Sequence, residues 1–315
     1  MLISGHSRLS ILRENHMFSG NTASQRRHNR KSINAAAASL ENRTLLAGTL
    51  AASLSADGTL TIDGDAASNN IRVAVTGATL QVTAGKQDMM NGGPFFFYPT
   101  ASVKNITISG NGGDDNVVVI GVNIPGYLTV KLGTGNDVAS IANSHVSGRL
   151  TINGDTGNDF SNIFSTEVDG DTILVDDSGN DQFRLSFSAH GKLNVLTGAG
   201  NDRVSTFGTS VDKATVINTG SGADDVTMTA SNFTESLNLA TAEGADHVSA
   251  DSNTFNGALK INTGSDSDDV DLFGNQFNAA ALLDGGLGND MLRLDDINFF
   301  TVMPSTKNFE RDTML

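Results

Sequence analysis

The stretch Gly285-Gly286-Leu287-Gly288-Asn289-Asp290-Met291-Leu292 is a glycine-rich turn that ends in an aspartate, with an apolar residue two positions further on. Similar turns recur upstream. Their last aspartates are Asp115, Asp137, Asp159, Asp181, Asp202, Asp224, Asp246, Asp268 and Asp290. Neighbouring members are 22 residues apart, except for one interval of 21 between Asp181 and Asp202. A fixed period of this length indicates a repeat protein.

Apolar columns keep the same register as the aspartates. Nine and seven residues before each aspartate lie Ile106/Ile108, Leu128/Val130, Leu150/Ile152, Thr172/Leu174, Leu193/Val195, Thr215/Ile217, Leu237/Leu239, Leu259/Ile261 and Ala281/Leu283. Nine residues after each aspartate lie Ile124, Val146, Val168, His190, Val211, Phe233, Phe255, Phe277 and Phe299. Apolar residues at alternate positions predict short β-strands with one buried face.

A unit of 22 residues with strands this short cannot bury its inner face alone, so successive units must stack. Helical repeats would need apolar residues three and four positions apart and few glycines, and the sequence has neither feature. The pattern therefore predicts an all-β, single-domain parallel β-helix with about 22 residues per coil. Stacked coils lie about 4.8 Å apart.

The chain divides into four segments. Residues 1–47 carry seven basic and two acidic side chains, a net charge of +5 in a chain of −15, and predict a disordered basic leader or export segment. Residues 48–104 predict degenerate first coils with an aromatic insertion over Met89–Pro99. This insertion covers the open end of the core or projects as a partner-binding loop. Residues 105–300 hold the regular repeats, and residues 301–315 form a C-terminal cap or tail.

Composition excludes several classes of protein. The chain has no cysteine, so it forms neither disulfides nor thiolate zinc sites. No apolar run approaches the roughly 20 residues that a transmembrane helix needs. The acidic balance, 35 acidic against 20 basic residues, disfavours nucleic acid and anionic membranes as partners. The natural counterparts of this surface are cations.

The turns Gly133–Asp137, Gly154–Asp159 and Gly285–Asp290 resemble the calcium-binding nonapeptides of repeats-in-toxin (RTX) proteins, Gly-Gly-x-Gly-x-Asp-x-apolar-x. This resemblance implies that turn carbonyls and aspartate carboxylates hold calcium between neighbouring turns, with the nine aspartates above as metal ligands. The RTX family has two motif turns in each 18-residue coil. Here there is one turn per 22-residue coil, so one column of ions at most is implied.

The aspartate column has a second interpretation, because glycine, asparagine and aspartate are good turn formers without any ligand. Two carboxylates about 4.8 Å apart, however, repel by about 0.9 kcal/mol even at the dielectric constant of water. Asparagine would form the turn without this repulsion, yet the position is aspartate in nine of nine repeats. The column therefore favours a bound divalent cation, and we expect Ca²⁺, which accepts six to eight oxygen ligands in loose geometry.

Parallel β-helices also include polysaccharide lyases and hydrolases, and an enzyme acting on an acidic polysaccharide is the alternative function. The best local cluster for it comprises Asp176, Asp177, Asp181, Arg184 and His190. Carboxylates repeat in every coil, however, and only two tyrosines and no tryptophan are present to stack on sugars. We expect a non-catalytic protein.

The segment Ser39–Ala47 resembles the Leu-Glu-x-Arg-x-Leu-Leu-Ala sequence near the N-terminus of many large secreted or surface proteins of planctomycete bacteria. The resemblance implies an extracellular or cell-surface location. Taken together, these features predict a calcium-binding solenoid with a structural or adhesive role, whose partner is a surface polymer or another surface protein.

Overall fold

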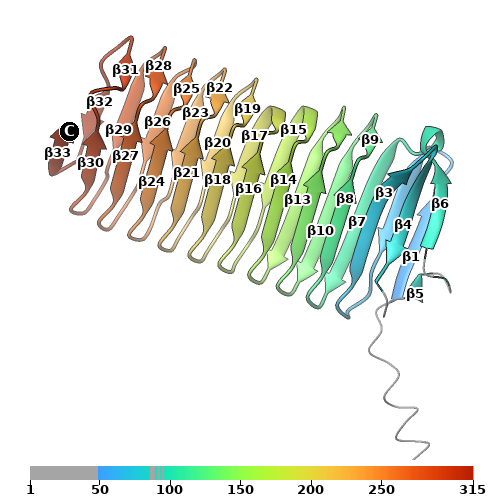
Figure 1. Cartoon of the computed structure of the whole chain (residues 1–315). Coiled ribbons are helices and arrows are strands. Elements are labelled where there is room, and N and C mark those ends of the chain that lie inside the picture. The colour runs from blue at the N-terminus through green and yellow to red at the C-terminus, as the bar shows by residue number, and fades with distance from the viewer. Residues whose placement is uncertain (1–48, 86–88, 91–92, 94, 315) are drawn as a thin grey trace, which may run out of the picture. The chain divides into compact units, whose positions relative to one another are not determined.

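The computed structural model describes residues 49–85, 89–90, 93 and 95–314, so the predicted basic leader lies outside the described residues. The chain is a parallel β-solenoid with about 22 residues per coil, and the predicted fold class is confirmed. Figure 1 shows the coils lying side by side in one row, from the blue strands at one end to the red strands at the other.

Each coil consists of two longer strands and one short strand. The first strands are β7 (Asn105–Gly112), β10 (Leu128–Thr134), β13 (Leu150–Thr156), β15 (Glu167–Val175), β17 (Ala189–Leu196), β20 (Thr215–Asn218), β23 (Leu237–Ala240), β26 (Leu259–Asn262) and β29 (Ala281–Asp284). The second strands are β8 (Asn116–Ile120), β11 (Val138–Ala142), β14 (Phe160–Phe164), β16 (Gln182–Ser186), β18 (Arg203–Phe207), β21 (Asp225–Thr229), β24 (His247–Asp251), β27 (Asp269–Phe273) and β30 (Met291–Leu294). The short strands are β9 (Asn123–Ile124), β12 (His145–Val146), β19 (Ser210–Val211), β22 (Asn232–Phe233), β25 (Thr254–Phe255), β28 (Gln276–Phe277) and β31 (Phe299–Phe300). In β15 and β17 the short strand of one coil continues into the first strand of the next.

Equivalent residues of neighbouring coils pair in register. Val130 of β10, for example, pairs with Ile108 of β7 on one side and with Ile152 of β13 on the other. The single 21-residue interval is absorbed at a bulge between β15 and β17. There Val168 pairs with His190, whereas Asp171 pairs with Lys192. The strand pairing before and after this bulge therefore stays in register.

The predicted apolar columns line the interior. Ile108, Val130 and Leu193, for example, are completely buried. The rings of Phe233, Phe255 and Phe277 stack nearly parallel, with centroids 5.5 and 5.1 Å apart. Such stacking adds to the burial of each ring and holds successive coils in register.

The last member of the third column was predicted wrongly. Phe299 is 61 % exposed, and Phe300 stacks on Phe277 instead, with ring centroids 4.5 Å apart. The loop between β30 and β31 contains one additional residue, because Asn298 lies in register with Asn275 after an interval of 23 residues. This insertion shifts the inward-facing position by one.

The two ends of the solenoid are built differently. At the N-terminal end, β1 (Thr49–Leu54) pairs antiparallel with β2 (Thr59–Asp63) and parallel with β5 (Met89–Met90), and β2 pairs parallel with β7. β3 (Asn70–Thr76) is parallel to β8, whereas β4 (Thr79–Ala84) and β6 (Phe95–Pro99) extend that sheet in antiparallel fashion. Phe96 and Tyr98 of β6 pack against the core. At the C-terminal end, β32 (Ser305–Lys307) and β33 (Arg311–Met314) continue the parallel pairing.

Candidate metal centre

The nine aspartates of the repeat form one row, which we call the aspartate ladder. Each lies between the glycine turn and the second strand of its coil, and each is only 1–3 % exposed. The members are Asp115, Asp137, Asp159, Asp181, Asp202, Asp224, Asp246, Asp268 and Asp290. The structure thus brings all nine predicted ligands together along one edge, with their side chains turned inward.

Main-chain hydrogen bonds join the ladder from coil to coil. The N–H of Asp137 donates to Oδ1 of Asp159 at 2.7 Å, and the N–H of Asp159 donates to Oδ1 of Asp181 at 2.8 Å. All eight links have this direction, with distances of 2.6–3.0 Å. Each aspartate therefore accepts through Oδ1 a hydrogen bond from the preceding coil.

Two further residues continue the ladder at its ends. Asn69, 2 % exposed, donates its N–H to Oδ1 of Asp115 at 2.7 Å. At the other end, the N–H of Asp290 donates to Oε2 of Glu310 at 2.6 Å. Asn69 follows Leu60 and Ile62 by nine and seven residues, which is the spacing of the ladder aspartates. Glu310 follows Asp290 by 20 residues instead of 22, so the repeat gives no signal for it.

The second carboxylate oxygen of every ladder aspartate is buried and has no hydrogen-bond partner. Oδ2 is in this state in all nine residues. A buried polar atom without a partner costs roughly 1–3 kcal/mol, and more when it carries charge. A bound proton or cation would neutralise these oxygens.

Burial raises the pKa of the ladder carboxyls, and neighbouring carboxylates add to it where they are close. Backbone hydrogen bonds partly offset this rise, and so do the hydroxyls of Thr197, Thr219, Thr241 and Thr263 beside Asp202, Asp224, Asp246 and Asp268. The pKa rises to about 6 for Asp115, Asp202 and Asp268, and to about 7 for Asp159 and Asp246. The pKa values of Asp137, Asp181, Asp224 and Asp290 are also raised. A cation bound at these oxygens competes with protons.

The glycine turns stack closely on one another. Along the column formed by Gly135, Gly157 and Gly179 there is no room for an ion between neighbouring turns. A Cβ on Gly157 would lie 1.4 Å from the carbonyl oxygen of Gly135, and a Cβ on Gly179 would lie 1.5 Å from that of Gly157. Gly157 also has φ +136°, which side chains rarely adopt. A cation held by the ladder would therefore lie on the inner side of the turn, at the Oδ2 atoms.

The donor set next to the ladder fits a hard cation. Five positions before the ladder aspartate, four successive coils carry the buried threonines Thr197, Thr219, Thr241 and Thr263. The hydroxyls of Thr197 and Thr241 donate to the carbonyls of Thr219 and Thr263, at 2.8 and 2.9 Å. Carboxylate, hydroxyl and carbonyl oxygens are the ligands that calcium prefers.

A second buried ladder, made of asparagines, runs along the corner between the second and the short strands. The N–H of Asn253 donates to Oδ1 of Asn275 at 2.9 Å, and that of Asn275 to Oδ1 of Asn298 at 2.8 Å. Their Nδ2 groups donate to the carbonyls of Met228 and Ala250, at 2.8 and 2.7 Å. This asparagine ladder is neutral, and its amides are satisfied by the protein alone.

A third row of side chains lies on the outside of the glycine turns. Asn136, Asn158, Asn180 and Asn201 are exposed, and each accepts an N–H from the following coil through Oδ1. The outer ladder therefore runs in the opposite direction to the aspartate ladder. It explains why asparagine precedes aspartate in these turns.

The residues weighed as a catalytic cluster are divided between the interior and the surface. Asp176, Asp181 and His190 are buried, whereas Asp177 and Arg184 are exposed. His190 Nδ1 lies 2.8 Å from the hydroxyl of Thr172, and burial lowers the pKa of His190 to about 4. An imidazole with this pKa is neutral and faces the core of the solenoid.

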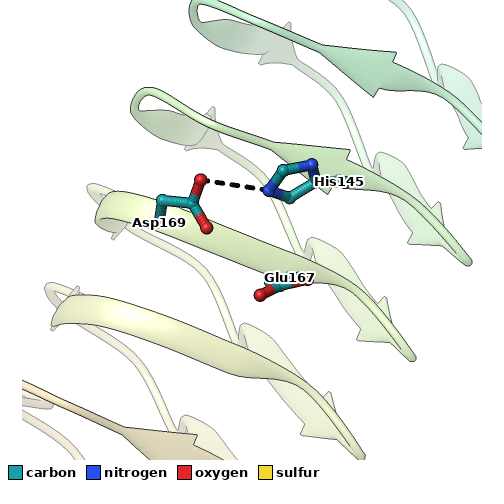
Figure 2. A group of neighbouring side chains, drawn as sticks. All are labelled: His145, Glu167 and Asp169. Carbon is teal, nitrogen blue, oxygen red and sulfur yellow. Dashed lines mark hydrogen bonds and ion pairs between the residues drawn. The ribbon is translucent and has the colours of Figure 1, made fainter.

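A surface cluster at β12 and β15 comprises His145, Glu167 and Asp169 (Figure 2). His145 Nε2 lies 3.1 Å from Oδ2 of Asp169, and the two side chains are 35 % and 50 % exposed. His145 and Glu167 pair in register on neighbouring coils. The two residues are 22 positions apart, so the repeat period was a signal for their proximity, although this cluster was not among the predicted sites.

Comparison with known proteins identifies no relative. No protein-family model, no curated protein and no solved structure matches the chain significantly. Within the described part of the chain, no helix has the length and apolar character to cross a membrane. The functional assignment therefore depends on the geometry of the site.

Proposed function

We propose that this protein is an extracellular or cell-surface solenoid that binds calcium along the aspartate ladder and has a structural or adhesive role without catalysis. The observation that carries the proposal is the row of nine buried Oδ2 atoms, none of which has a hydrogen-bond partner. Calcium bound between coils would neutralise these oxygens and link one coil to the next. The similarity of Ser39–Ala47 to surface-protein sequences supports the location.

The asparagine ladder strengthens the case for a cation. Asn253 and Asn275 perform the same main-chain task as the ladder aspartates, and they do so without charge. A neutral ladder is therefore accessible to this fold. Aspartate at all nine positions of the other edge implies a role for the second oxygen, and binding a divalent cation is such a role.

Calcium would also couple folding to location. A ligand that binds only the native state stabilises it by mass action, in proportion to the logarithm of its concentration. In a low-calcium compartment the ladder carboxylates repel one another, and in a calcium-rich environment the same residues hold the coils together. An exported chain would then reach its full stability only outside the cell.

The test is thermal unfolding in calcium and in chelator, followed by circular dichroism. The wild-type melting temperature should rise with calcium. Asp246→Asn should lose part of that rise, whereas the matched control Asp212→Asn, at an exposed position outside the ladder, should keep it. Identical melting of the wild type in calcium and in chelator would refute the proposal.

A polysaccharide lyase or hydrolase remains the alternative function. It requires an acid and a base that face one cleft. Asp176, Asp181 and His190 are buried, and Arg184 lies on the outer surface, so this group offers no such cleft. Release of reducing or unsaturated sugars from acidic polysaccharides would support the alternative.

A further inference from the structure

One coil departs from the pattern of side chains that faces the aspartate ladder. Five residues before each ladder aspartate the coils carry, in order, Gly110, Leu132, Gly154, Asp176, Thr197, Thr219, Thr241, Thr263 and Gly285. Asp176 is the one charged residue in this column, and it is 3 % exposed. The repeat does not require a carboxylate here, because the next four coils have threonine.

Asp176 meets two members of the ladder. One carboxylate oxygen from each of Asp159, Asp176 and Asp181 lies within 4.8 Å of the others. All three side chains are at least 97 % buried, since their exposures are 3 %, 3 % and 2 %. Oδ2 of Asp159 and Oδ2 of Asp181 have no hydrogen-bond partner. Two carboxyl groups that each have an unpartnered buried oxygen therefore lie next to a third carboxyl group.

The preceding coil is shaped to accept these oxygens. The N–H of Gly154 donates to Oδ1 of Asp176 at 2.6 Å. A Cβ on Gly154 would lie 2.0 Å from this Oδ1 and 2.4 Å from Oδ2 of Asp159. Only glycine leaves the room that the two carboxylates occupy, so the cluster is built by two neighbouring coils together.

The cluster has no positive partner among the described residues. None of the ion pairs found there involves Asp159, Asp176 or Asp181. Burial, together with the charges of Asp181 and Asp159, raises the pKa of Asp176 to about 9. Three ionised carboxylates this close and this buried are strongly unfavourable unless a cation is bound among them.

We infer that Asp159, Asp176 and Asp181 form a discrete site for a single divalent cation of the calcium type, the highest-affinity position of the solenoid. The inference rests on the calcium chemistry of the proposed function, but it does not require the remaining coils to be occupied. Oxygen-only ligands select a hard cation over zinc or copper. At this site one ion links the coil that contains Asp159 to the next coil, which contains Asp176 and Asp181.

The experiment measures calcium bound per chain by isothermal titration and by elemental analysis after gel filtration. The wild type is compared with Asp176→Thr, which introduces the residue of the next four coils, and with the isosteric Asp176→Asn. Asp212→Asn, at an exposed position outside the ladder, is the matched control, and Asp246→Asn reports on the ladder in a coil without a third carboxylate. We expect both Asp176 variants to lose one equivalent of the tightest-bound calcium, with at least a tenfold loss of affinity at that site.

The outcomes separate this inference from the proposed function. One bound ion in the wild type, none in the Asp176 variants and no effect of Asp246→Asn would uphold the site and refute binding along the ladder. Several ions in the wild type, with equal numbers in the Asp176 variants, would overturn the site and uphold the ladder. No bound calcium in the wild type would overturn both.

Melting in chelator provides a second readout. Without calcium, the buried carboxyl of Asp176 must hold a proton to stay neutral. Asp176→Thr removes this group and should melt at the same temperature as the wild type or above it. With calcium, the difference should shrink or reverse, because only the wild type gains from the bound ion. A variant that is less stable than the wild type in chelator, and equally responsive to calcium, would show that Asp176 serves packing alone.

Discussion

The two buried ladders of this solenoid perform the same backbone task with different chemistry. In both, a side-chain oxygen accepts the main-chain N–H of the preceding coil, at 2.7–3.0 Å for Asp137, Asp159 and Asp268 and at 2.9 Å for Asn253. The remaining atom differs. Nδ2 of Asn253 donates to the carbonyl of Met228, whereas Oδ2 of each ladder aspartate has no partner.

This difference means that the asparagine ladder is satisfied by the protein alone, whereas the aspartate ladder depends on the solution. The asparagine ladder is complete once the chain has folded. The aspartate ladder needs protons or cations from solution, so its strength varies with pH and calcium. The solenoid thus has one edge of constant stability and one edge that responds to its environment.

The largest expected effect concerns how tightly the aspartate edge is packed. Gly157→Ala places a methyl group against the Gly135 carbonyl at an unfavourable φ of +136°, and should destabilise the protein by about 4 kcal/mol. Gly121 lies between β8 and β9, at the same corner as the asparagine ladder but in an earlier coil, and it has φ +66° with no atom within 4 Å of its Cβ position. Gly121→Ala should cost about 1 kcal/mol, from the backbone alone. Urea unfolding measures both, and equal losses would mean that the turns are not in close contact.

Exchanging the chemistry of the two ladders is the next test. Asn253→Asp replaces the amide that donates to the Met228 carbonyl with a carboxylate oxygen, and should cost about 3 kcal/mol. Asp246→Asn makes the opposite change, and in chelator it should cost little or increase stability. The measurement is the free energy of unfolding of each variant in chelator, compared with that of the wild type. If Asn253→Asp is tolerated as well as Asp246→Asn, the two corners are equivalent and the comparison fails.

The pH dependence of the aspartate edge follows from its raised pKa values. The folded state holds protons more tightly than the unfolded chain, so this contribution is complete below pH 3.8 and is lost as the pH rises through about 6 to 7. In chelator, the melting temperature should therefore increase by about 5 °C from pH 8 to pH 6. Calcium should reduce this change, because it competes for the same oxygens. A melting temperature that falls over this range would contradict the raised pKa values.

His190 sets the lower limit of that experiment. Its pKa is lowered from 6.5 to about 4, so its contribution has the opposite sign. The stability associated with the neutral imidazole is lost as the pH falls below 6.5 towards 4. Between pH 8 and pH 6 the ladder and Asp176, whose pKa is raised to about 9, contribute in the same direction, and His190 opposes them only below pH 6.5. Measurements at still lower pH combine all of these effects.

The smallest expected effect belongs to the exposed outer ladder. Asn158→Ala removes the oxygen that accepts the Asn180 N–H at 2.6 Å, but water can replace it. The cost should be about 0.5 kcal/mol, without any change in the response to calcium. Thermal melting in calcium and in chelator checks both expectations. A loss as large as that of Asn253→Asp would show that exposure does not weaken these links.

The fold could be predicted from the sequence because the backbone geometry requires certain residue types at fixed positions of each coil. Apolar residues at alternate positions identify the inward face, and glycine occurs where the turns stack. The constant spacing of the aspartates placed them in one row. The register failed at Phe299, since a one-residue insertion in a surface loop leaves no signature in the repeat.

The internal geometry of the site lay beyond sequence reasoning. The repeat shows that Asp159 and Asp181 are neighbours, but it does not show that their side chains turn inward or that Oδ1 is already hydrogen-bonded. Nor does it show that Asp176 joins them. Asp176 was weighed as a catalytic residue because it stands out from the repeat, whereas its role depends on the space that Gly154 leaves one coil earlier.

The links of the aspartate ladder all point towards the C-terminus, and Glu310 accepts the last of them. The aspartate N–H of each coil is therefore paired only after the next coil has folded. A chain that emerges N-terminus first would carry an incomplete leading edge throughout its synthesis. The two edges of a partly formed stack therefore differ in chemistry, because the C-terminal edge leaves a main-chain N–H unpaired and the N-terminal edge leaves a carboxylate oxygen unpaired.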